Sequence, residues 1–251
     1  RVTTRSDVES LAGSARSVAD LAAVELTRLF LSLDLSSPEL VKAALLEVVP
    51  DLVVVFGDLS ATAAAEWYEG VRASAVGGSF SALTADAASR EAVEGSVRWA
   101  ADSLWSDAPA AALGALAGAV QRHVTYSARA TVARNVARDP ARPRYARVPR
   151  GAKTCAWCSM LSSRGFVYHS TASAGEMDGH YHDRCDCQQV PEWDADGSHI
   201  EGYDPDEMYA QYMAAREATG LPTPGQKAIT AQMRRLFPES FTDGVFPASD
   251  V

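Results

Sequence analysis

The stretch that decides the fold begins Cys155-Ala-Trp-Cys158 and ends His180-Tyr-His182-Asp-Arg-Cys185-Asp-Cys187. It contains all four cysteines of the chain. Thiolate and imidazole are the ligands that zinc prefers, and four of them complete a tetrahedral structural site. The sequence therefore predicts a small zinc-stabilised module here, with a helical platform before it.

The spacing of these residues has a physical reason. A tight turn in C-x-x-C can aim two sulfurs at one point, and a hairpin or loop then brings the second group back to the same ion. The preferred ligands are Cys155, Cys158, His182 and Cys185. A set in which Cys187 replaces His182 or Cys185 is the rival, and the spacing leaves both sets open.

Two other interpretations of the four cysteines are a pair of disulfides and a group of inert buried thiols. Four cysteines allow three disulfide pairings. The chain shows no apolar signal segment at its N-terminus, so the sequence gives no support for an oxidising compartment. Thiols buried by chance would not gather within one short stretch. A metal site is therefore the favoured interpretation.

The same stretch resembles a known family. The Cys155-x-x-Cys158 pair, the Arg164-Gly165 turn and the His182-x-x-Cys185-x-Cys187 group followed by Pro191 resemble the C-terminal motif of the Mu F-like minor head proteins of tailed phages. The second half of that motif typically reads H-P-x-C-R-C, whereas residues 182–187 here read His-Asp-Arg-Cys-Asp-Cys. The resemblance covers residues 148–193, and variants from actinobacterial phages look closest.

The resemblance implies a phage minor capsid protein that acts in head morphogenesis. Such a protein is expected inside the capsid of the virion near the portal, and in the host cytoplasm during assembly. The expected partners are portal or capsid proteins and possibly packaged DNA. Some relatives are described as capsid maturation proteases, which makes a head-associated protease one alternative, and a zinc-stabilised nucleic-acid-binding module is the other.

Apolar residues recur at helical spacing before the cysteine stretch, and helix-starting and helix-stopping residues divide them. The predicted helices span residues 8–32, 37–49, 60–75, 84–104 and 107–138. Residues 52–56 form an apolar run that fits either a strand or a continued helix. Beyond the cysteines, helices are predicted at 205–219 and 226–236, strands at 147–149, 166–168 and near 189–190, and a loop at 170–179.

We therefore expect an α+β protein that is predominantly α. Its expected parts are an N-terminal helical bundle over residues 1–138, a basic connector over 139–153, a zinc-binding β-hairpin and loop module over 154–195, and C-terminal helices with a tail over 196–251. Trp157 and Trp193 are expected to cover the metal site. No run approaches about 18 apolar residues free of charge, so no membrane-spanning helix is expected.

Charge is distributed unevenly along the chain. The net charge is −9, yet residues 122–153 hold 9 Lys or Arg against 1 acidic residue. Basic density of this kind can contact phosphate, or it can pair with acidic partners. Arg142, Arg144, Arg147 and Arg150 are the candidate contacts with nucleic acid or with a partner protein.

The sequence carries none of the common catalytic motifs. The chain contains no G-x-S-x-G, P-loop, dinucleotide-binding or H-E-x-x-H pattern. Ser159, Ser162 and Ser163 lie near the cysteines, but the sequence sets no base against them, and His169 and His180 are more typical of solvated loop residues. Five candidate ligands favour a closed, structural metal site, so an enzyme is not the favoured interpretation.

Overall fold

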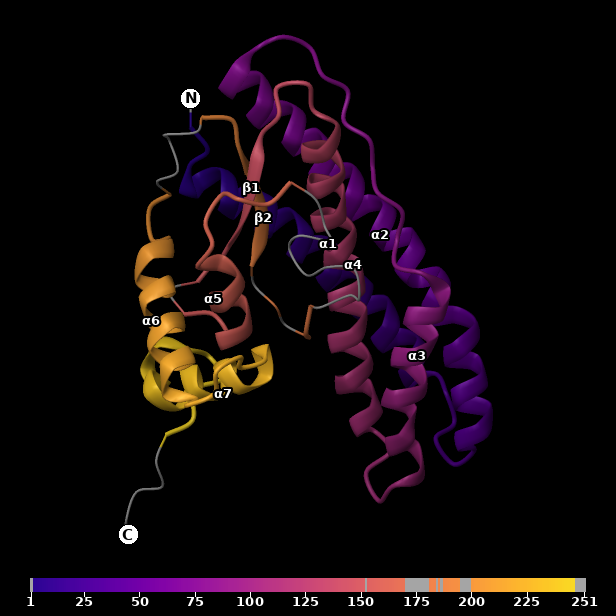
Figure 1. The fold of residues 1–251 in the computed structure, drawn as a ribbon. Helices are drawn as coiled ribbons and strands as arrows, with labels where there is room; N and C mark the ends of the chain where they lie inside the picture. The colour runs from indigo at the N-terminus through magenta and orange to yellow at the C-terminus, as the bar shows by residue number, and fades with distance from the viewer. Residues whose placement is uncertain are drawn as a thin grey trace.

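The computed structural model describes residues 2–151, 153–169, 181–183, 185, 187–194 and 200–246. Its described part is mostly helical with one two-stranded antiparallel sheet, which confirms the predicted α+β, predominantly α class. Figure 1 shows the two strands between a long helical bundle and the C-terminal helices. The predicted loop over residues 170–179 and His180 lie outside the described residues.

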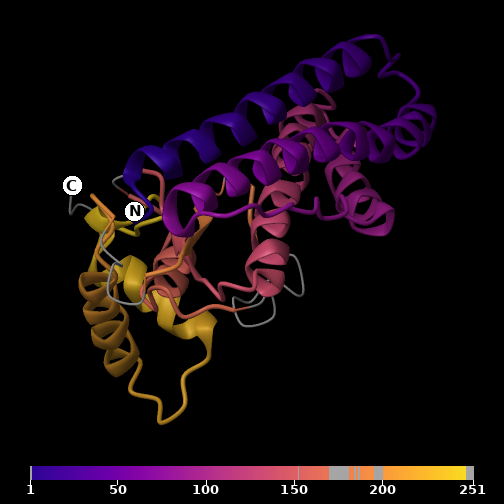
Figure 2. The same ribbon diagram turned by 90° about the horizontal axis from the view of Figure 1, so that it is seen from above.

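The bundle consists of α1 (Arg5–Leu31), α2 (Pro38–Val76), α3 (Arg90–Ala101) and α4 (Ala111–Arg138). Helices α1, α2 and α4 pack on one another, and α3 packs on α2 and α4. Figure 2 shows α1 and α2 running side by side along the length of the bundle. Leu26, Val53 and Leu116 are fully buried in its largest apolar cluster. Among the described residues, no helix is long and apolar enough to cross a membrane.

Helix α1 begins close to the predicted residue because local chemistry fixes its start. Thr4 is the N-cap, and its side chain accepts the Asp7 amide while Asp7 accepts the Thr4 amide. This reciprocal capping box satisfies two amides that the first turn leaves unpaired. The predicted helix over residues 8–32 is confirmed.

Helix α2 corrects the prediction of two shorter helices. It continues without a break through Pro50, and the apolar run over residues 52–56 is part of it. A proline inside a helix removes one backbone hydrogen bond and costs about 3 kcal/mol. The flanking residues Val49 and Val53 are buried against the rest of the bundle, and this packing outweighs the local penalty.

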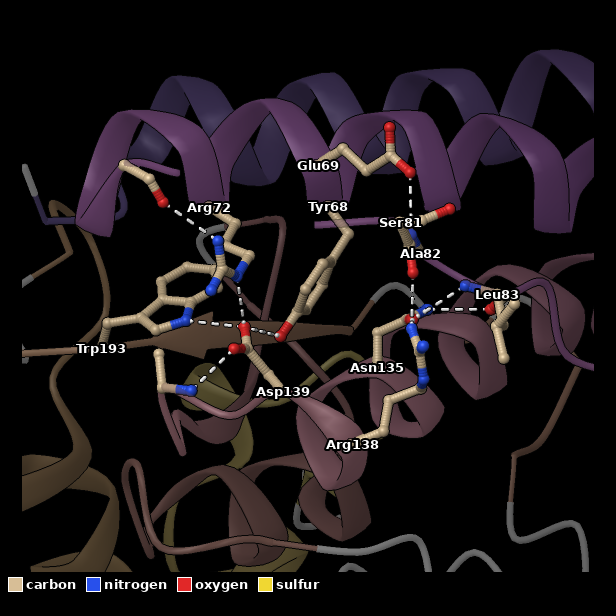
Figure 3. Close-up of polar contacts among 12 residues, drawn as sticks. Tyr68, Glu69, Arg72, Ser81, Ala82, Leu83, Asn135, Arg138, Asp139 and Trp193 are labelled. Atoms are coloured by element: carbon tan, nitrogen blue, oxygen red, sulfur yellow. Dashed lines mark hydrogen bonds and ion pairs between the residues drawn. The ribbon is translucent and has the colours of Figure 1, made fainter. Parts of the chain in front are cut away.

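The segment before α3 also differs from the prediction. The helix expected from residue 84 begins at Arg90, with Ser89 as its N-cap, and a 3-10 helix follows it over Asp102–Trp105. Residues 79–89 instead lie along α4 in extended form. The Asn135 side chain accepts the Leu83 amide and donates to the Leu83 carbonyl, both at 2.9 Å, as Figure 3 shows. These side-chain partners from a distant helix replace the helical hydrogen bonds.

Strands β1 (Arg144–Val148) and β2 (Gln188–Glu192) form the sheet, with Arg144 opposite Glu192 and Val148 opposite Gln188. The strands predicted near residues 147–149 and 189–190 are confirmed. The strand predicted over residues 166–168 is reduced to one bridge between Tyr168 and Tyr145. A short helix that the sequence did not predict, α5 (Ala156–Ser162), follows β1.

The C-terminal helices α6 (Pro205–Ala218) and α7 (Gln226–Leu236) match the predicted helices and pack on α5. Met160 of α5, Ala215 of α6 and Met233 of α7 share one buried cluster. A 3-10 turn over Pro238–Ser240 follows α7. The C-terminal helices therefore cover the side of α5 with a small core of their own.

Asp139 joins the bundle to the sheet. Its buried carboxylate accepts hydrogen bonds from Arg72 Nε at 2.9 Å, Trp193 Nε1 at 3.0 Å and the Tyr68 hydroxyl at 3.1 Å, and Figure 3 shows all three side chains converging on it. Burial alone would raise the pKa of Asp139, but these donors, Arg72 foremost, hold it below its usual value. Trp193 therefore packs on Tyr68 and does not cover the cysteines, contrary to expectation.

Candidate metal centre

The first pair of candidate ligands lies at the start of α5. Cys155 is the N-cap of this helix, and its sulfur accepts the Cys158 amide at 3.3 Å. Both cysteines are buried, with 5% and 0% of their surfaces exposed. The C-x-x-C turn predicted from the sequence is thus the first turn of a helix, and it directs both sulfurs to the same side.

The second pair comes from the segment that leads into β2. The Cys158 sulfur lies 3.3 Å from that of Cys185 and 3.4 Å from that of Cys187, and the latter two lie 3.2 Å apart. Four sulfurs bound tetrahedrally to zinc at about 2.3 Å stand about 3.8 Å from one another. The three sulfurs are thus within a few tenths of an ångström of the spacing that a shared ion requires.

His182 completes the cluster from its more exposed side. Its Nε2 lies 2.7 Å from the Cys155 sulfur, and its Nδ1 lies 2.8 Å from the Asp183 carbonyl oxygen. A carbonyl oxygen only accepts hydrogen bonds, so Nδ1 carries a proton and Nε2 is the atom that faces the sulfurs. Metal-binding histidines are commonly held in this way by a backbone carbonyl.

The five residues fall into two overlapping groups that can each hold a metal ion, Cys155–Cys158–His182 and Cys158–Cys185–Cys187. Within each group, all ligand atoms lie within 4.8 Å of one another, and Cys158 belongs to both. Four thiols and one imidazole are soft donors, so the chemistry of the cluster fits a thiophilic divalent ion. The structure thus brings together every ligand that the sequence proposed.

Two of the four cysteines, Cys155 and Cys187, favour the thiolate, the form of cysteine that binds metals. Hydrogen bonds with the other three sulfurs raise the pKa of Cys158 well above its ordinary value. A hydrogen bond from Cys158 lowers the pKa of Cys185, but the hydrogen bond with Cys187 and burial outweigh it and raise that pKa to about 12. Hydrogen bonds, first from Cys158 and then from His182, lower the pKa of Cys155 to about 5. Hydrogen bonds from Cys158 and Cys185, helped by the charges of Arg147 and Arg129, hold the pKa of Cys187 well below its ordinary value. The hydrogen bond with Cys155 also raises the pKa of His182 to about 9.

Two buried arginines stand beside the cluster, and the sequence did not predict this role for either. Arg129 of α4 and Arg147 of β1 are 1% and 0% exposed. Each guanidinium carbon lies 4.2 Å from the centre of the Tyr181 ring. Arg147 was expected to contact nucleic acid or a partner, and this expectation is wrong because its side chain is enclosed within the protein.

The remaining predicted contact residues, Arg142, Arg144 and Arg150, are exposed. Within the described ranges, none of these three side chains takes part in a hydrogen bond or an ion pair. Arg144 begins β1, and Arg142 adopts a left-handed backbone conformation with a φ of 53° just before it. These three charges are therefore accessible, unlike that of Arg147.

The structure offers little for catalysis near the cysteines. Ser159, Ser162 and Ser163 are buried, and across the part of the chain that is described none of them bonds to a histidine. A serine–histidine contact exists elsewhere, where Ser96 Oγ lies 3.0 Å from His123 Nε2 between α3 and α4. Burial and the neighbouring Arg122 lower the pKa of His123 to about 4, which makes it a weak base.

Comparison with known proteins gives one family match. The model of the family described as VG15 protein matches residues 2–215. The Gene 15 protein of Mycobacterium phage D29 is 30% identical over 175 residues, which cover 54% of this chain and 63% of that protein. The Gene 15 protein of Mycobacterium phage L5 is 42% identical over 82 residues, 28% of each chain.

The matched part of the chain thus spans less than two thirds of the length of either phage relative. No solved structure matches the chain.

Proposed function

The chain belongs to the VG15 protein family, and from this premise we propose that it is a structural protein of a phage head with a structural zinc centre. Its matched relatives are phage proteins, and its cysteine stretch resembles the Mu F-like minor head motif. On this proposal it is a minor capsid protein that acts in head morphogenesis. It lies inside the capsid near the portal, and in the host cytoplasm during assembly.

One observation carries the zinc centre. Soft donors from two segments separated along the chain, residues 155–158 and 182–187, meet in one largely buried cluster. Zinc is the ion that such thiolate and imidazole sets commonly bind in structural sites. Four of the five donors Cys155, Cys158, His182, Cys185 and Cys187 would hold the ion, which would act as a cross-link between α5 and the approach to β2.

The outer surface of the bundle supports a portal or capsid protein as the partner of this chain. Leu21 and Val24 of α1 and Val48, Val55 and Leu59 of α2 are large apolar side chains with 39–58% of their surfaces exposed. Exposed apolar side chains can contact another protein where they lie next to one another, whereas single ones are common on any protein surface. The acidic composition outside residues 122–153 gives no comparable support for wrapping DNA.

The proposed location is tested in a phage that encodes this protein. Procapsids and mature heads are purified by density gradient and analysed by quantitative mass spectrometry. The protein is expected in procapsids, and it is expected to remain with the portal when the shell is dissociated. Its absence from both particles would exclude the proposal, because a head morphogenesis protein must enter at least one of them.

Contact with nucleic acid is a second candidate, favoured by the accessible charges of Arg142, Arg144 and Arg150. Each phosphate contact adds about one unit to the slope of log affinity against log salt, so replacing all three with Gln should make that slope shallower by about two to three units. Fluorescence anisotropy with a DNA duplex from 50 to 200 mM salt measures this. If the protein does not bind DNA, this candidate is excluded. It is also excluded if the triple variant has the same salt slope as the unaltered protein.

A further inference from the structure

The side chain of Arg129 links the long bundle helix α4 to the metal centre. Its guanidinium is 1% exposed, and its planar fork reaches the loop that carries the last two cysteines. Nε donates to the Cys187 carbonyl at 3.0 Å and Nη2 donates to the Cys185 carbonyl at 2.8 Å. Nη1 lies 3.4 Å from Thr125 Oγ1, one turn earlier on α4.

This geometry constrains the backbone at Cys185 and at Cys187. One rigid guanidinium holds the carbonyl oxygens of both residues, so neither carbonyl can turn without losing a hydrogen bond to the same group. A bidentate arginine gives this kind of directional control, whereas a lysine offers a single point charge. The orientation of both cysteine sulfurs is thereby tied to α4, a helix that packs mainly on α1, α2 and α3 of the bundle and also contacts β1 and β2.

The charge of Arg129 has a counterpart in the cluster itself. A buried guanidinium is costly unless an anion or a π-system stabilises it. No carboxylate forms an ion pair with Arg129 in the part of the chain that the structure describes. The groups that stabilise its charge are the sulfurs of Cys185 and Cys187 and the ring of Tyr181, 4.2 Å away, whereas the neighbouring charge of Arg147 opposes it.

We infer that Arg129 is a positioning residue of the metal centre: it holds the Cys185 and Cys187 backbone in the binding geometry and places a compensating charge beside an anionic metal–thiolate cluster. This inference rests on the proposed metal site and extends it. The affinity for a thiophilic ion is then set by the bundle as well as by the cysteines, through a residue that is not itself a ligand.

The test compares three variants of the full chain. R129M removes the charge and the fork, and R129K keeps a charge but not the fork. R134M is the matched control, because Arg134 also lies on α4 and donates to a backbone carbonyl, that of Thr84. Zinc affinity is measured by competition with a chromophoric chelator, and the binding geometry by the thiolate-to-metal absorption bands of the cobalt(II) form. Far-ultraviolet circular dichroism reports helix content.

We expect R129M to lower zinc affinity 10- to 100-fold, the usual effect of losing a group that orients metal ligands. R129K should lose about tenfold, and both should show altered cobalt bands, while R134M matches the unaltered protein. If R129M does not fold, R129K decides the question. If R129K or R129M binds zinc as tightly as R134M does and gives the same cobalt spectrum, the inference is overturned. An unaltered protein that binds no metal instead overturns the proposed metal site.

Discussion

The helical bundle and the cysteine module hold their shapes by different means. The bundle buries an apolar core that runs its whole length, with Leu26, Val53 and Leu116 among its fully enclosed side chains. The cysteine module is here residues 144–194, and its described part contains two short strands and one seven-residue helix. Its cysteines occupy the centre, where the bundle has leucine and valine. A region with so small an apolar core generally needs a metal or disulfides.

This difference explains which parts of the fold could be predicted from the sequence. Apolar periodicity specifies helices in a core that packing stabilises, and ligand spacing specifies a module that an ion stabilises. The two regions meet at Asp139 and Arg129, whose polar contacts belong to neither pattern.

Cys158→Ser should disrupt the module while the bundle survives. Cys158 is common to both groups of candidate ligands, so its loss leaves neither group complete. A structural zinc contributes on the order of 10 kcal/mol in small zinc-dependent domains. Amide hydrogen exchange should show lost protection over residues 155–162 and 188–192, with α1, α2 and α4 still protected. Equal loss of protection in α1 would contradict the separation of the two regions.

Asp139→Ala should destabilise the junction between the regions by about 3–5 kcal/mol, because it leaves the buried charge of Arg72 without its carboxylate. Urea unfolding monitored by tryptophan fluorescence measures the change. Asp51→Ala is the matched control, since its ion pair with Arg90 is solvent-exposed and worth less than about 1 kcal/mol. Similar losses in the two variants would show that the buried pair has no special role.

Acidification should weaken the bundle through His123. Its pKa is about 4 in the folded protein and about 6.5 when unfolded, so the unfolded chain binds the proton first. Stability is therefore unaffected above pH 6.5 and falls by about 2–3 kcal/mol as the pH decreases to 4. Urea titrations of the unaltered protein and of His123→Gln between pH 7 and pH 4 measure this loss. The variant should lose less stability over that interval, and parallel losses would assign the effect to other groups.

The smallest effect is expected at the first turn of α1. Thr4→Ala removes the hydroxyl of the capping box, which should cost about 1 kcal/mol. The loss should appear in the thermal unfolding midpoint and leave zinc affinity unchanged, since the cap lies in the bundle. A change in metal content would show that α1 and the metal centre are more tightly coupled than described.

The same contrast between the two regions determines which elements could be predicted from the sequence. Local signals predicted both C-terminal helices: Pro205 marked the start of α6, and the helical spacing of Ile229, Met233 and Leu236 marked α7. The predicted helix end before Pro50 was wrong because the helix-breaking tendency of proline is local, whereas the packing that keeps α2 intact comes from helices distant in the sequence. Helix α5, at seven residues, is too short for apolar periodicity to be recognised.

For the metal centre too, local spacing could be predicted from the sequence and long-range packing could not. The spacing of the cysteines was enough to propose that five donors meet, because ligand spacing is a local property. The burial of Arg147 and the contacts of Arg129 depend on which strand and helix enclose them, and charge patterning alone made Arg147 resemble its exposed neighbours. Tyr181, whose ring centre lies 4.2 Å from each of the two guanidinium carbons, could not be distinguished in the sequence from any other aromatic residue in a loop.

A bound ion should organise the cysteine module, and the metal content of the purified protein is the decisive measurement. Protein purified under reducing conditions is analysed by native and inductively coupled plasma mass spectrometry, with a thiol count before and after chelation. The account predicts about one zinc per chain and four thiols that react only after the chelator is added. Protein without metal, whose four cysteines react freely or are paired as disulfides, would contradict it.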